Sequence, residues 1–354
     1  MNPRLLLASC VVVLQLGVLG FMAGQREWIA QFGHPLLLRT TPIDPNDPMR
    51  GEFALLDYEI SHVPSPWLHS GTKPNHYGYN QLRDLKVYAQ LKENEAGIAE
   101  IVALGVRLPD RGLYLAGRVQ YDDGNRITVH YGIEALFLEQ GKARQLEDAR
   151  RKERPGVPLL IEVAVDSSGV AVLRGYRWAP LGLTATFERA TVPATKGNER
   201  TGARPMPARQ YVSAINLEVK NYGPDQVAIV DLASPGAWRL VPNNSTQPSQ
   251  YRWVGEAGSS ARPSAQDVIL LKSGQVHKCH IDLSDRQWFV VDTNLPLAQQ
   301  SPVPLRDLTN TWGASFRIEY KPPTKADTAG LPGADAIFHD RLLSRAFSPT
   351  MGMD

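Results

Sequence analysis

The sequence predicts a mainly β protein that begins with one hydrophobic helix, and three observations support this. An apolar run covers residues 5–23 and is interrupted only by Ser9 and Gln15. Short runs rich in apolar residues, bounded by turn formers, recur between residues 52 and 320. The 354 residues include 27 prolines and 29 glycines, which punctuate strands more often than long helices.

Composition and charge exclude several classes of function. The chain has 38 basic and 36 acidic residues, a formal net charge of +2, so no nucleic-acid partner is predicted. Of its two cysteines, Cys10 lies in the apolar run, which leaves no disulfide framework. The sequence contains no phosphate loop and no dinucleotide fingerprint, so we expect no cofactor.

The apolar run is predicted to form a transmembrane helix within residues 1–24. Its nineteen residues would span about 28 Å as a helix, close to a bilayer core of about 30 Å. The apolar region of a cleaved secretory signal is shorter, so we expect a signal anchor in contact with membrane lipid. Cleavage after Gly20 stays open. Arg4 before the run favours an N-terminus on the cytoplasmic side.

Residues 25–187 are predicted to form a small, barrel-like β domain with one helix. Strand patterns cover residues 52–60, 86–93 and 113–121, and hairpin turns are expected at residues 122–125 and 166–169. The helix is expected over residues 139–156, which are rich in helix formers and end in Pro155-Gly156. Leu146 is its only large apolar residue, which places this helix on the surface.

The remaining chain is predicted to hold a linker, a second β domain and a tail. Residues 188–209 contain Pro, Gly, Thr and charge without an apolar period, as an exposed linker would. About eight short strand patterns follow within residues 210–323, and this spacing favours an immunoglobulin-like β-sandwich. Residues 324–354 are predicted to be a C-terminal tail.

One stretch carries a family resemblance. "GEFALLDY", residues 51–58, resembles the motif of the GDYXXLXY family of bacterial membrane-anchored proteins. Gly51, Leu56 and Tyr58 match, whereas Glu52 replaces Asp and Phe53 replaces Tyr. The segment "YGIEALFLEQG", residues 131–141, resembles a second landmark of that family. The resemblance covers residues 38–176 and implies topology, because the family has no established activity.

The resemblance also directs attention to a set of binding residues. They are Asp44, Asp47, Gly51, Glu52, Phe53, Leu56, Tyr58, Glu134 and Glu139. The plain structural interpretation is a turn followed by a strand that founds a barrel, since "PIDPNDP" is a run of turn formers and Gly51 tolerates unusual backbone angles. A cation site at Asp44, Asp47, Glu52 and Asp57 is conceivable, but the spacing is not that of an EF-hand.

Catalytic and metal-binding patterns are weak elsewhere. On a strand, His277 and Cys279 would share one face while His280 points away, so three zinc ligands do not converge. No G-x-S-x-G motif occurs, and no Ser precedes the motif as in the Ser–Lys signal-peptidase-like barrels, for which Lys86 and Lys92 are the nearest lysines. We therefore predict no catalytic residue and no metal site.

We expect a protein of the bacterial inner membrane that crosses it once and holds its body on the periplasmic side. Its expected role is non-enzymatic, as a binding or assembly partner of a polytopic membrane protein, which the resemblance suggests. One alternative is a membrane-tethered hydrolase with a signal-peptidase-like barrel. Another is a cell-wall or glycan-binding module in which Trp238, Trp253, Trp288 and Trp312 form an exposed stacking platform.

Overall fold

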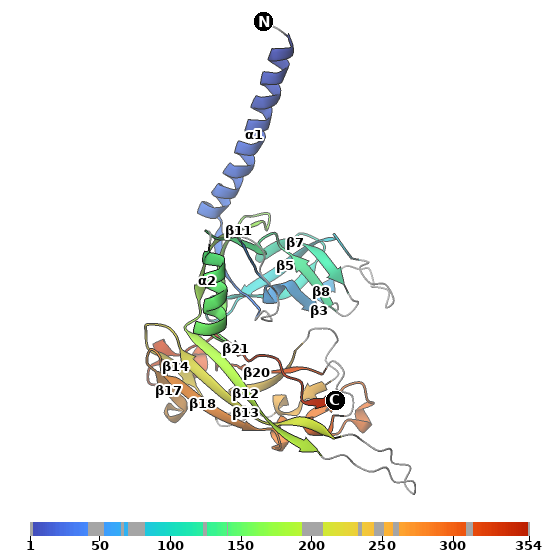
Figure 1. Cartoon of the computed structure of the whole chain (residues 1–354), viewed down its shortest axis with the longest axis vertical. Helices are drawn as coiled ribbons and strands as arrows, with labels where there is room; N and C mark the ends of the chain where they lie inside the picture. The colour runs from blue at the N-terminus through green and yellow to red at the C-terminus, as the bar shows by residue number, and fades with distance from the viewer. Residues whose placement is uncertain are drawn as a thin grey trace. The chain divides into compact units, whose positions relative to one another are not determined.

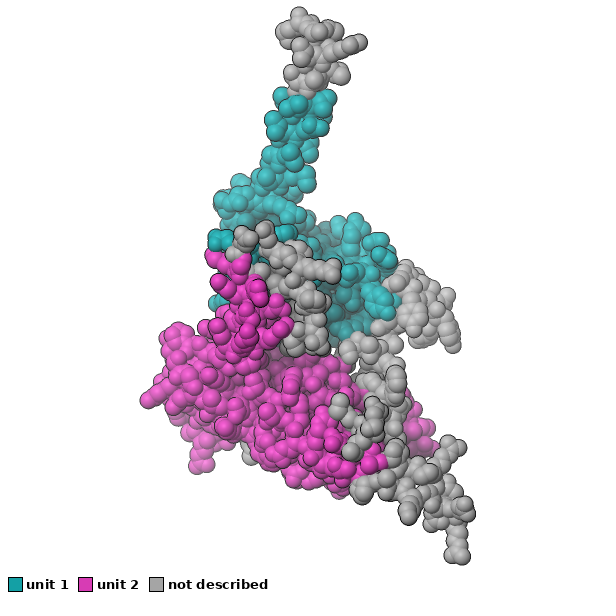
Figure 2. Space-filling view, viewed as in Figure 1, with its two compact units in different colours: residues 1–41, 49–140, 159–177 teal, residues 42–48, 141–158, 178–354 magenta. Residues whose placement is uncertain are grey.

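The computed structural model shows a mainly β protein (Figure 1). It describes residues 3–41, 53–64, 67–69, 82–122, 126–139, 141–192, 208–232, 236–243, 251–257, 262–308 and 314–352. The chain forms two compact units, which Figure 2 colours separately. The first unit comprises residues 1–41, 49–140 and 159–177, and the second comprises residues 42–48, 141–158 and 178–354.

The predicted N-terminal helix is present and is longer than expected. Helix α1 (Pro3–Phe32) continues beyond residue 24 because residues 25–32 contain neither Gly nor Pro, and it ends before Gly33. Among the helices within the described ranges, none combines the length and the apolar character needed to cross a membrane.

A six-stranded sheet forms most of the first unit, in the order β3-β8-β7-β5-β6-β4. Its strands are β3 (His62–Pro64), β4 (Leu68–His69), β5 (Lys86–Glu93), β6 (Ala99–Gly105), β7 (Leu113–Asp122) and β8 (Arg126–His130). The expected alternation in β5 is confirmed, because Val87, Ala89 and Leu91 are buried. This sheet therefore has one face directed to a core.

Strand β1 (His34–Arg39) closes this sheet into a nearly complete barrel. It pairs antiparallel with β10 (Leu159–Val165), which lies beside β11 (Ala171–Trp178). Isolated bridges join the β1 segment to the chain just before β6, from Leu37 to Ile98, and to the chain that leads through residues 59–61 into β3, from Thr40 to Tyr58. The barrel-like fold predicted for this part of the chain is thus confirmed.

A small ribbon carries the family motif. Strand β2 (Phe53–Leu55) pairs antiparallel with β9 (Ala135–Phe137), and a 3-10 turn, η1 (Glu59–Ser61), follows β2.

The predicted turn at residues 166–169 is confirmed, since the Asp166 carboxylate accepts the Ser168 and Val170 amides and Gly169 has a φ of 83°. Residues 123–125 of the other predicted turn lie outside the described residues.

The second unit contains all eight strands expected between residues 210 and 323. Its strands are β12 (Leu181–Val192), β13 (Arg209–Asn221), β14 (Val227–Val230), β15 (Trp238–Pro242), β16 (Tyr251–Trp253), β17 (Val268–Leu271), β18 (Val276–Asp282), β19 (Val290–Asp292), β20 (Phe316–Tyr320), β21 (Leu342–Leu343) and β22 (Thr350–Gly352). They form the sheets β12-β13-β18 with β22 on β13, β14-β17, β15-β20-β21 and β16-β19.

Two segments expected to be irregular contribute to the second unit instead. The described ends of the predicted linker, residues 188–209, belong to β12 and β13, which pair as far as Val192 opposite Arg209. The predicted tail supplies β21 and β22 and buries Ile337, Phe338 and Phe347. Apolar side chains spaced irregularly between turn residues can enter a core without showing a period, which is why the sequence pattern missed them.

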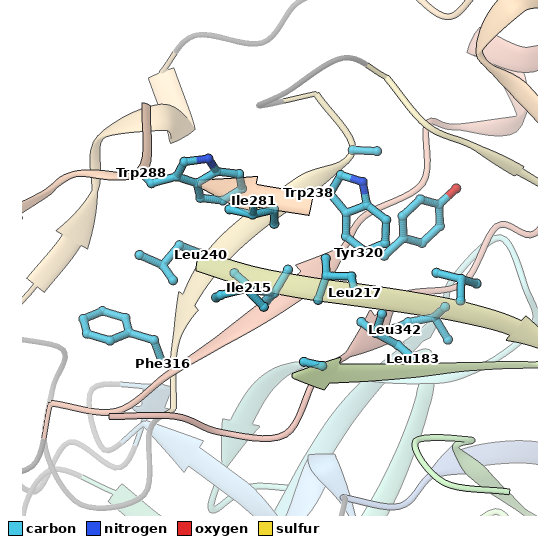
Figure 3. Packing of buried hydrophobic residues seen from close by; sticks show 14 of the residues in the cluster. Leu183, Ile215, Leu217, Trp238, Leu240, Ile281, Trp288, Phe316, Tyr320 and Leu342 are labelled. Carbon is cyan, nitrogen blue, oxygen red and sulfur yellow. The ribbon is translucent and has the colours of Figure 1, made fainter. Parts of the chain in front are cut away.

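The core of the second unit includes three of the tryptophans considered for glycan stacking. Trp238, Trp253 and Trp288 are at most 6% exposed (Figure 3 shows Trp238 and Trp288), so they do not form an exposed platform. Trp312 lies outside the described residues. The indole N–H of Trp238 donates to Asp231 and that of Trp253 to the Gln287 carbonyl, so burial leaves neither donor unsatisfied.

The expected surface helix belongs to the second unit. Helix α2 (Lys142–Asp148) continues as a π-helical turn over Ala149–Glu153, and a 3.4 Å ion pair joins Glu147 to Arg151. The side chain of Leu146 is buried. The other helical elements are α3 (Lys325–Thr328), η4 (Val254–Ala257), η5 (Ala265–Asp267), η6 (Arg286–Trp288), η7 (Leu297–Gln299), η8 (Leu305–Asp307) and η9 (Ala334–Ala336).

Two glycines that flank this helix make a matched test of its packing. Gly141 and Gly156 both have positive φ, but a Cβ at Gly141 would meet no atom within 4 Å, whereas one at Gly156 would lie 2.0 Å from the Leu183 carbonyl oxygen. We expect Gly141→Ala to lower the free energy of unfolding by about 1 kcal/mol, from backbone strain alone. Gly156→Ala should cost at least twice as much in urea denaturation, and equal losses would contradict the close approach.

Candidate functional site

The motif strand directs alternate side chains to opposite sides. Leu56 and Tyr58 are buried, whereas Leu55, the last residue of β2, is 56% exposed. Of the other predicted binding residues at this end of the chain, Asp44, Asp47, Gly51 and Glu52 lie outside the described residues, and Phe53 is described only in its backbone. The matched Leu and Tyr of the motif are therefore core residues.

Two buried tyrosines lock the motif segment to the second landmark of the family resemblance. The Tyr58 hydroxyl donates to the Ile133 carbonyl at 2.6 Å, and the Tyr131 hydroxyl donates in return to the Ile60 carbonyl at 2.8 Å. Burial, with the nearby charge of Glu134, raises the pKa of both phenols well above the ordinary tyrosine value. Both hydroxyls therefore stay protonated and remain donors.

Glu134 stabilises the turn that carries Tyr131 and Ile133, two residues of these tyrosine hydrogen bonds. Its carboxylate accepts the backbone amides of Tyr131 and Gly132, and its own carbonyl accepts the Leu56 amide at 2.7 Å. Gly132 has a φ of 80°, a conformation that suits glycine. Glu134 thus supports the fold, while Glu139, the other predicted acid of this segment, lies exposed beyond β9.

A polar cluster that the sequence did not indicate lies beside the motif. The Asp57 carboxylate accepts the Thr41 hydroxyl at 2.7 Å, and the same Asp57 oxygen lies 2.6 Å from Nε2 of His62. Burial alone would raise the pKa of Asp57, but His62, then Thr41 and the charge of Arg126, outweigh it and hold that pKa below its ordinary value. The carboxylate therefore ties the end of β1 to the start of β3.

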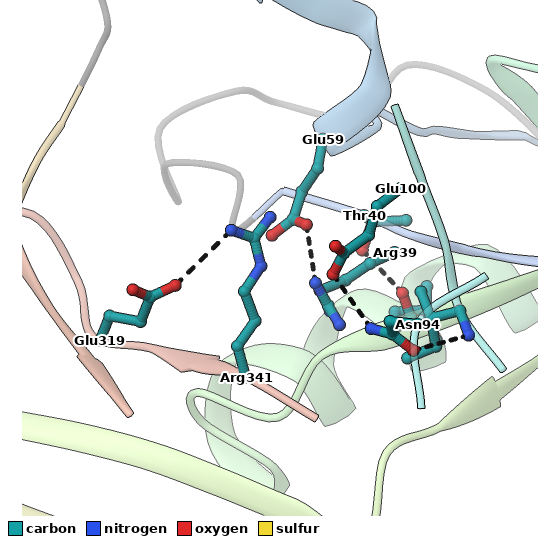
Figure 4. A network of polar contacts seen from close by, with 9 residues as sticks. Arg39, Thr40, Glu59, Asn94, Glu100, Glu319 and Arg341 are labelled. Carbon is teal, nitrogen blue, oxygen red and sulfur yellow. Dashed lines mark hydrogen bonds and ion pairs between the residues drawn. The ribbon is translucent and has the colours of Figure 1, made fainter. Parts of the chain in front are cut away.

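A buried ion pair lies between the same elements. Arg39, in β1, contacts Glu59, in η1, at 2.8 Å, and their side chains are only 4% and 14% exposed (Figure 4). Breaking such a pair leaves a buried charge uncompensated, which is strongly destabilising. Together with Thr41, Asp57 and His62, this ion pair forms a polar cluster where the end of β1 meets the segment between β2 and β3.

The arrangement around Asp57 does not match a hydrolytic triad. A triad needs a hydroxyl or thiol hydrogen-bonded to the histidine, which in turn is oriented by the acid. Here the Thr41 hydroxyl bonds the acid itself, and Nδ1 of His62 is enclosed without a hydrogen bond among the described residues. Ser61, next in the chain, is 2% exposed. The cluster is suited to fastening strands.

A similar acid–histidine pair occurs in the second unit. Asp231 lies 2.6 Å from Nε2 of His277 and also accepts the Trp238 indole N–H. Cys279 shares the face of β18 with His277, as expected, but burial and then the charge of Asp231 raise the pKa of its thiol to about 11. A thiol with so high a pKa is a poor nucleophile at neutral pH.

No metal centre is formed by the His, Cys, Asp and Glu side chains that the structure describes. His280 points away from His277 and bonds the Asn216 amide oxygen at 2.7 Å, as strand alternation predicts. The two lysines considered for a Ser–Lys pair are exposed, and Lys86 lies 5.2 Å from the ring centroid of Tyr88.

Comparison with known proteins agrees with the resemblance found in the sequence. Residues 15–175 match a family described as GDYXXLXY protein. The matched range ends within β11 and so includes the tyrosine lock and the Asp57 cluster. No curated protein matches the chain.

The tyrosine lock predicts a specific loss of stability. Tyr58→Phe removes one hydroxyl and leaves the buried Ile133 carbonyl without that donor, so we expect the free energy of unfolding to fall by about 1–3 kcal/mol. Tyr131→Phe should behave likewise, and the double variant should lose less than the sum because the pair acts together. Tyr121→Phe, at a 44% exposed position, is the control and should change stability by less than about 0.5 kcal/mol.

The Asp57 cluster predicts a dependence of stability on pH. Because the folded-state pKa of Asp57 is lowered, its contribution is present above the unfolded-state pKa near 3.8 and is lost as the pH falls through the folded value. Asp57→Asn should therefore reduce stability at pH 7 and flatten the decline below pH 4 in urea titrations. A variant whose acid profile runs parallel to that of the unaltered protein would contradict this role.

Proposed function

Residues 15–175 of this chain match the GDYXXLXY protein family, and on this premise we propose that the chain is a binding or assembly protein anchored in a membrane. The whole apolar run of residues 5–23, of which the structure describes the side chains of residues 10–23, would make α1 a single-pass anchor in contact with lipid. The partner would be a polytopic membrane protein. The membrane would be the bacterial inner membrane, with both compact units on the periplasmic side.

The exposure of α1 carries this proposal. Nine large apolar side chains between Val11 and Met22 are each 47–72% exposed. Successive helical residues are about 100° apart, so these side chains cover every side of the helix. A helix that is apolar all round needs a core or a membrane to cover it. Lipid and the helices of a polytopic protein are both suitable covers.

The internal bonding of the motif supports a role other than catalysis. The polar groups of Tyr58, Glu134 and Asp57 form hydrogen bonds within the barrel. A binding surface must then be formed by side chains that point outward, and α1 presents the longest apolar stretch of these among the described residues. Arg4, at the start of the helix, supports an N-terminus on the cytoplasmic side.

We also propose that the second unit is an immunoglobulin-like sandwich. Support comes from the eight strands that lie at the expected places between residues 210 and 323, and from the core in which the ring centroids of Trp238 and Tyr320 lie 5.2 Å apart. Strands distant in sequence pair antiparallel, such as β15 with β20 and β16 with β19, as they do in Greek-key sandwiches.

A charge within the apolar run tests the anchor. Leu14→Asp places a carboxylate where about 2.5–3.5 kcal/mol opposes insertion, so most of the chain should move from the carbonate-resistant membrane pellet to the supernatant. Gln25→Asp introduces the same charge on the same helix beyond the run and should leave the chain in the pellet.

Protease treatment of spheroplasts and co-purification from solubilised membranes complete this test. We expect the two compact units to be cut from outside the cell and one polytopic protein to co-purify. Protection of the body from protease would contradict the topology. Failure of Leu14→Asp to change the fractionation would contradict the anchor.

A further inference from the structure

Helix α1 leads into the first strand of the barrel without a linker. Only Gly33 separates Phe32, the last residue of α1, from His34, the first of β1. The Gly33 amide donates to the Ile29 carbonyl at 2.8 Å, and Ile29 is buried. A Cβ at Gly33 would lie 2.5 Å from the Ile29 carbonyl oxygen and 3.0 Å from the Val165 amide nitrogen. The first approach lies within the helix end and the second is a tight contact with β10, so a side chain at residue 33 would have to shift this junction.

Two aromatic rings are exposed on the last turns of the same helix. Trp28 and Phe32 are 66% and 65% exposed, and their ring centroids are 4.4 Å apart. Trp28 lies five residues, about 7.5 Å, beyond the end of the apolar run at Ala23. Since the headgroup layer adds about 5–8 Å on each side of the bilayer core, Trp28 would fall within it. Tryptophan is enriched at that level.

The β10–β11 hairpin reaches toward the same end of the barrel. Val165 pairs with His34, so the turn that follows β10 extends beyond the start of β1, on the side where α1 ends. Val170 at this turn is 43% exposed. The turn is fastened to β7, because the Ala116 amide donates to the Gly169 carbonyl at 2.8 Å and the Tyr114 hydroxyl donates to the Ser167 carbonyl.

From these contacts we propose that the barrel rests directly on the bilayer surface, with Trp28 in the interfacial layer of the phospholipid and with Phe32 and Val170 facing the outer surface of that layer. The inference depends on the proposed function, because it requires α1 to lie in the membrane. It adds that the barrel is held at a fixed height and orientation. The occupant is a phospholipid interface because the apolar run is followed on the same helix by the polar residues 25–27 and then by the exposed rings of Trp28 and Phe32. Polar and aromatic side chains follow an apolar span in this way at a membrane surface.

Site-directed spin labelling of the full chain tests the contact. In a Cys10→Ser, Cys279→Ser background, single labels are placed by Leu14→Cys, Val170→Cys and Leu55→Cys, and the protein is reconstituted in phosphatidylcholine–phosphatidylglycerol nanodiscs that contain a nickel-chelating lipid. Leu55 is the control position because it lies at the opposite end of β1 from α1, past the Thr40–Tyr58 bridge. The length of β1 places it about 20 Å from His34, where β1 begins. We expect headgroup nickel to relax the label at 170 at least fivefold more than the label at 55. The label at 14 should be accessible to oxygen and not to aqueous nickel.

The three labels separate the two proposals. Equal relaxation at 170 and 55, with the label at 14 inside the bilayer, would overturn the surface contact and leave the anchor standing. A label at 14 that is accessible to aqueous nickel would overturn the anchor and the contact together.

A glycine pair tests the fixed orientation. A Cβ at Gly33 would crowd the Ile29 carbonyl oxygen and the Val165 amide nitrogen, so Gly33→Ala should shift the junction of helix and barrel, whereas a Cβ at Gly24 on the same helix meets no atom within 4 Å. Gly33→Ala should reduce nickel relaxation of the label at 170 at least twofold, and Gly24→Ala should leave it unchanged. Unchanged relaxation in both variants would overturn the rigid coupling of α1 to the barrel.

Discussion

The first unit depends on one buried seam, where the end of β1 meets the segment after β2. The Thr40–Tyr58 bridge closes the barrel at this point, and the carbonyls of Ile60 and Ile133 each accept a tyrosine hydroxyl. A buried carbonyl without a donor costs roughly as much as a lost hydrogen bond, so this exchange decides whether the ends of the sheet can meet. The ion pair of Arg39 with Glu59 and the bonds of Asp57 add to the same seam.

This seam explains why a short motif can identify a fold without identifying a reaction. Leu56 and Tyr58 of the motif are both buried, as is Tyr131 of the second landmark. Replacing any of them would lower the stability of the barrel without touching a binding surface. Outward-facing positions, such as those of α1 and Leu55, are free of this constraint. The outward-facing side chains that would meet lipid and a membrane partner are therefore different from the buried side chains of the motif.

The sequence predicted the candidate site only in part, because a local sequence pattern says little about which side chains meet in the fold. Strand alternation was enough to place His277 and Cys279 on one face of β18 and His280 on the other. It gave no sign that Asp57 would bond Thr41, or that Asp231 would bond His277 from 46 residues away. Both pairings arise where separate strands meet at their ends, and no spacing in the chain encodes such a meeting.

The sequence by itself determined the local elements: the apolar helix, the hairpin turn at residues 166–169, the surface helix and eight strands of the second unit. Each has a signal of period, turn chemistry or composition that acts over a few neighbouring residues. Only the tertiary structure decided that residues beyond 324 enter the core, that three tryptophans are buried, and that Gly33 lies in a tightly packed junction between α1 and the barrel. These outcomes depend on close packing between segments far apart in the chain, which a linear pattern does not specify.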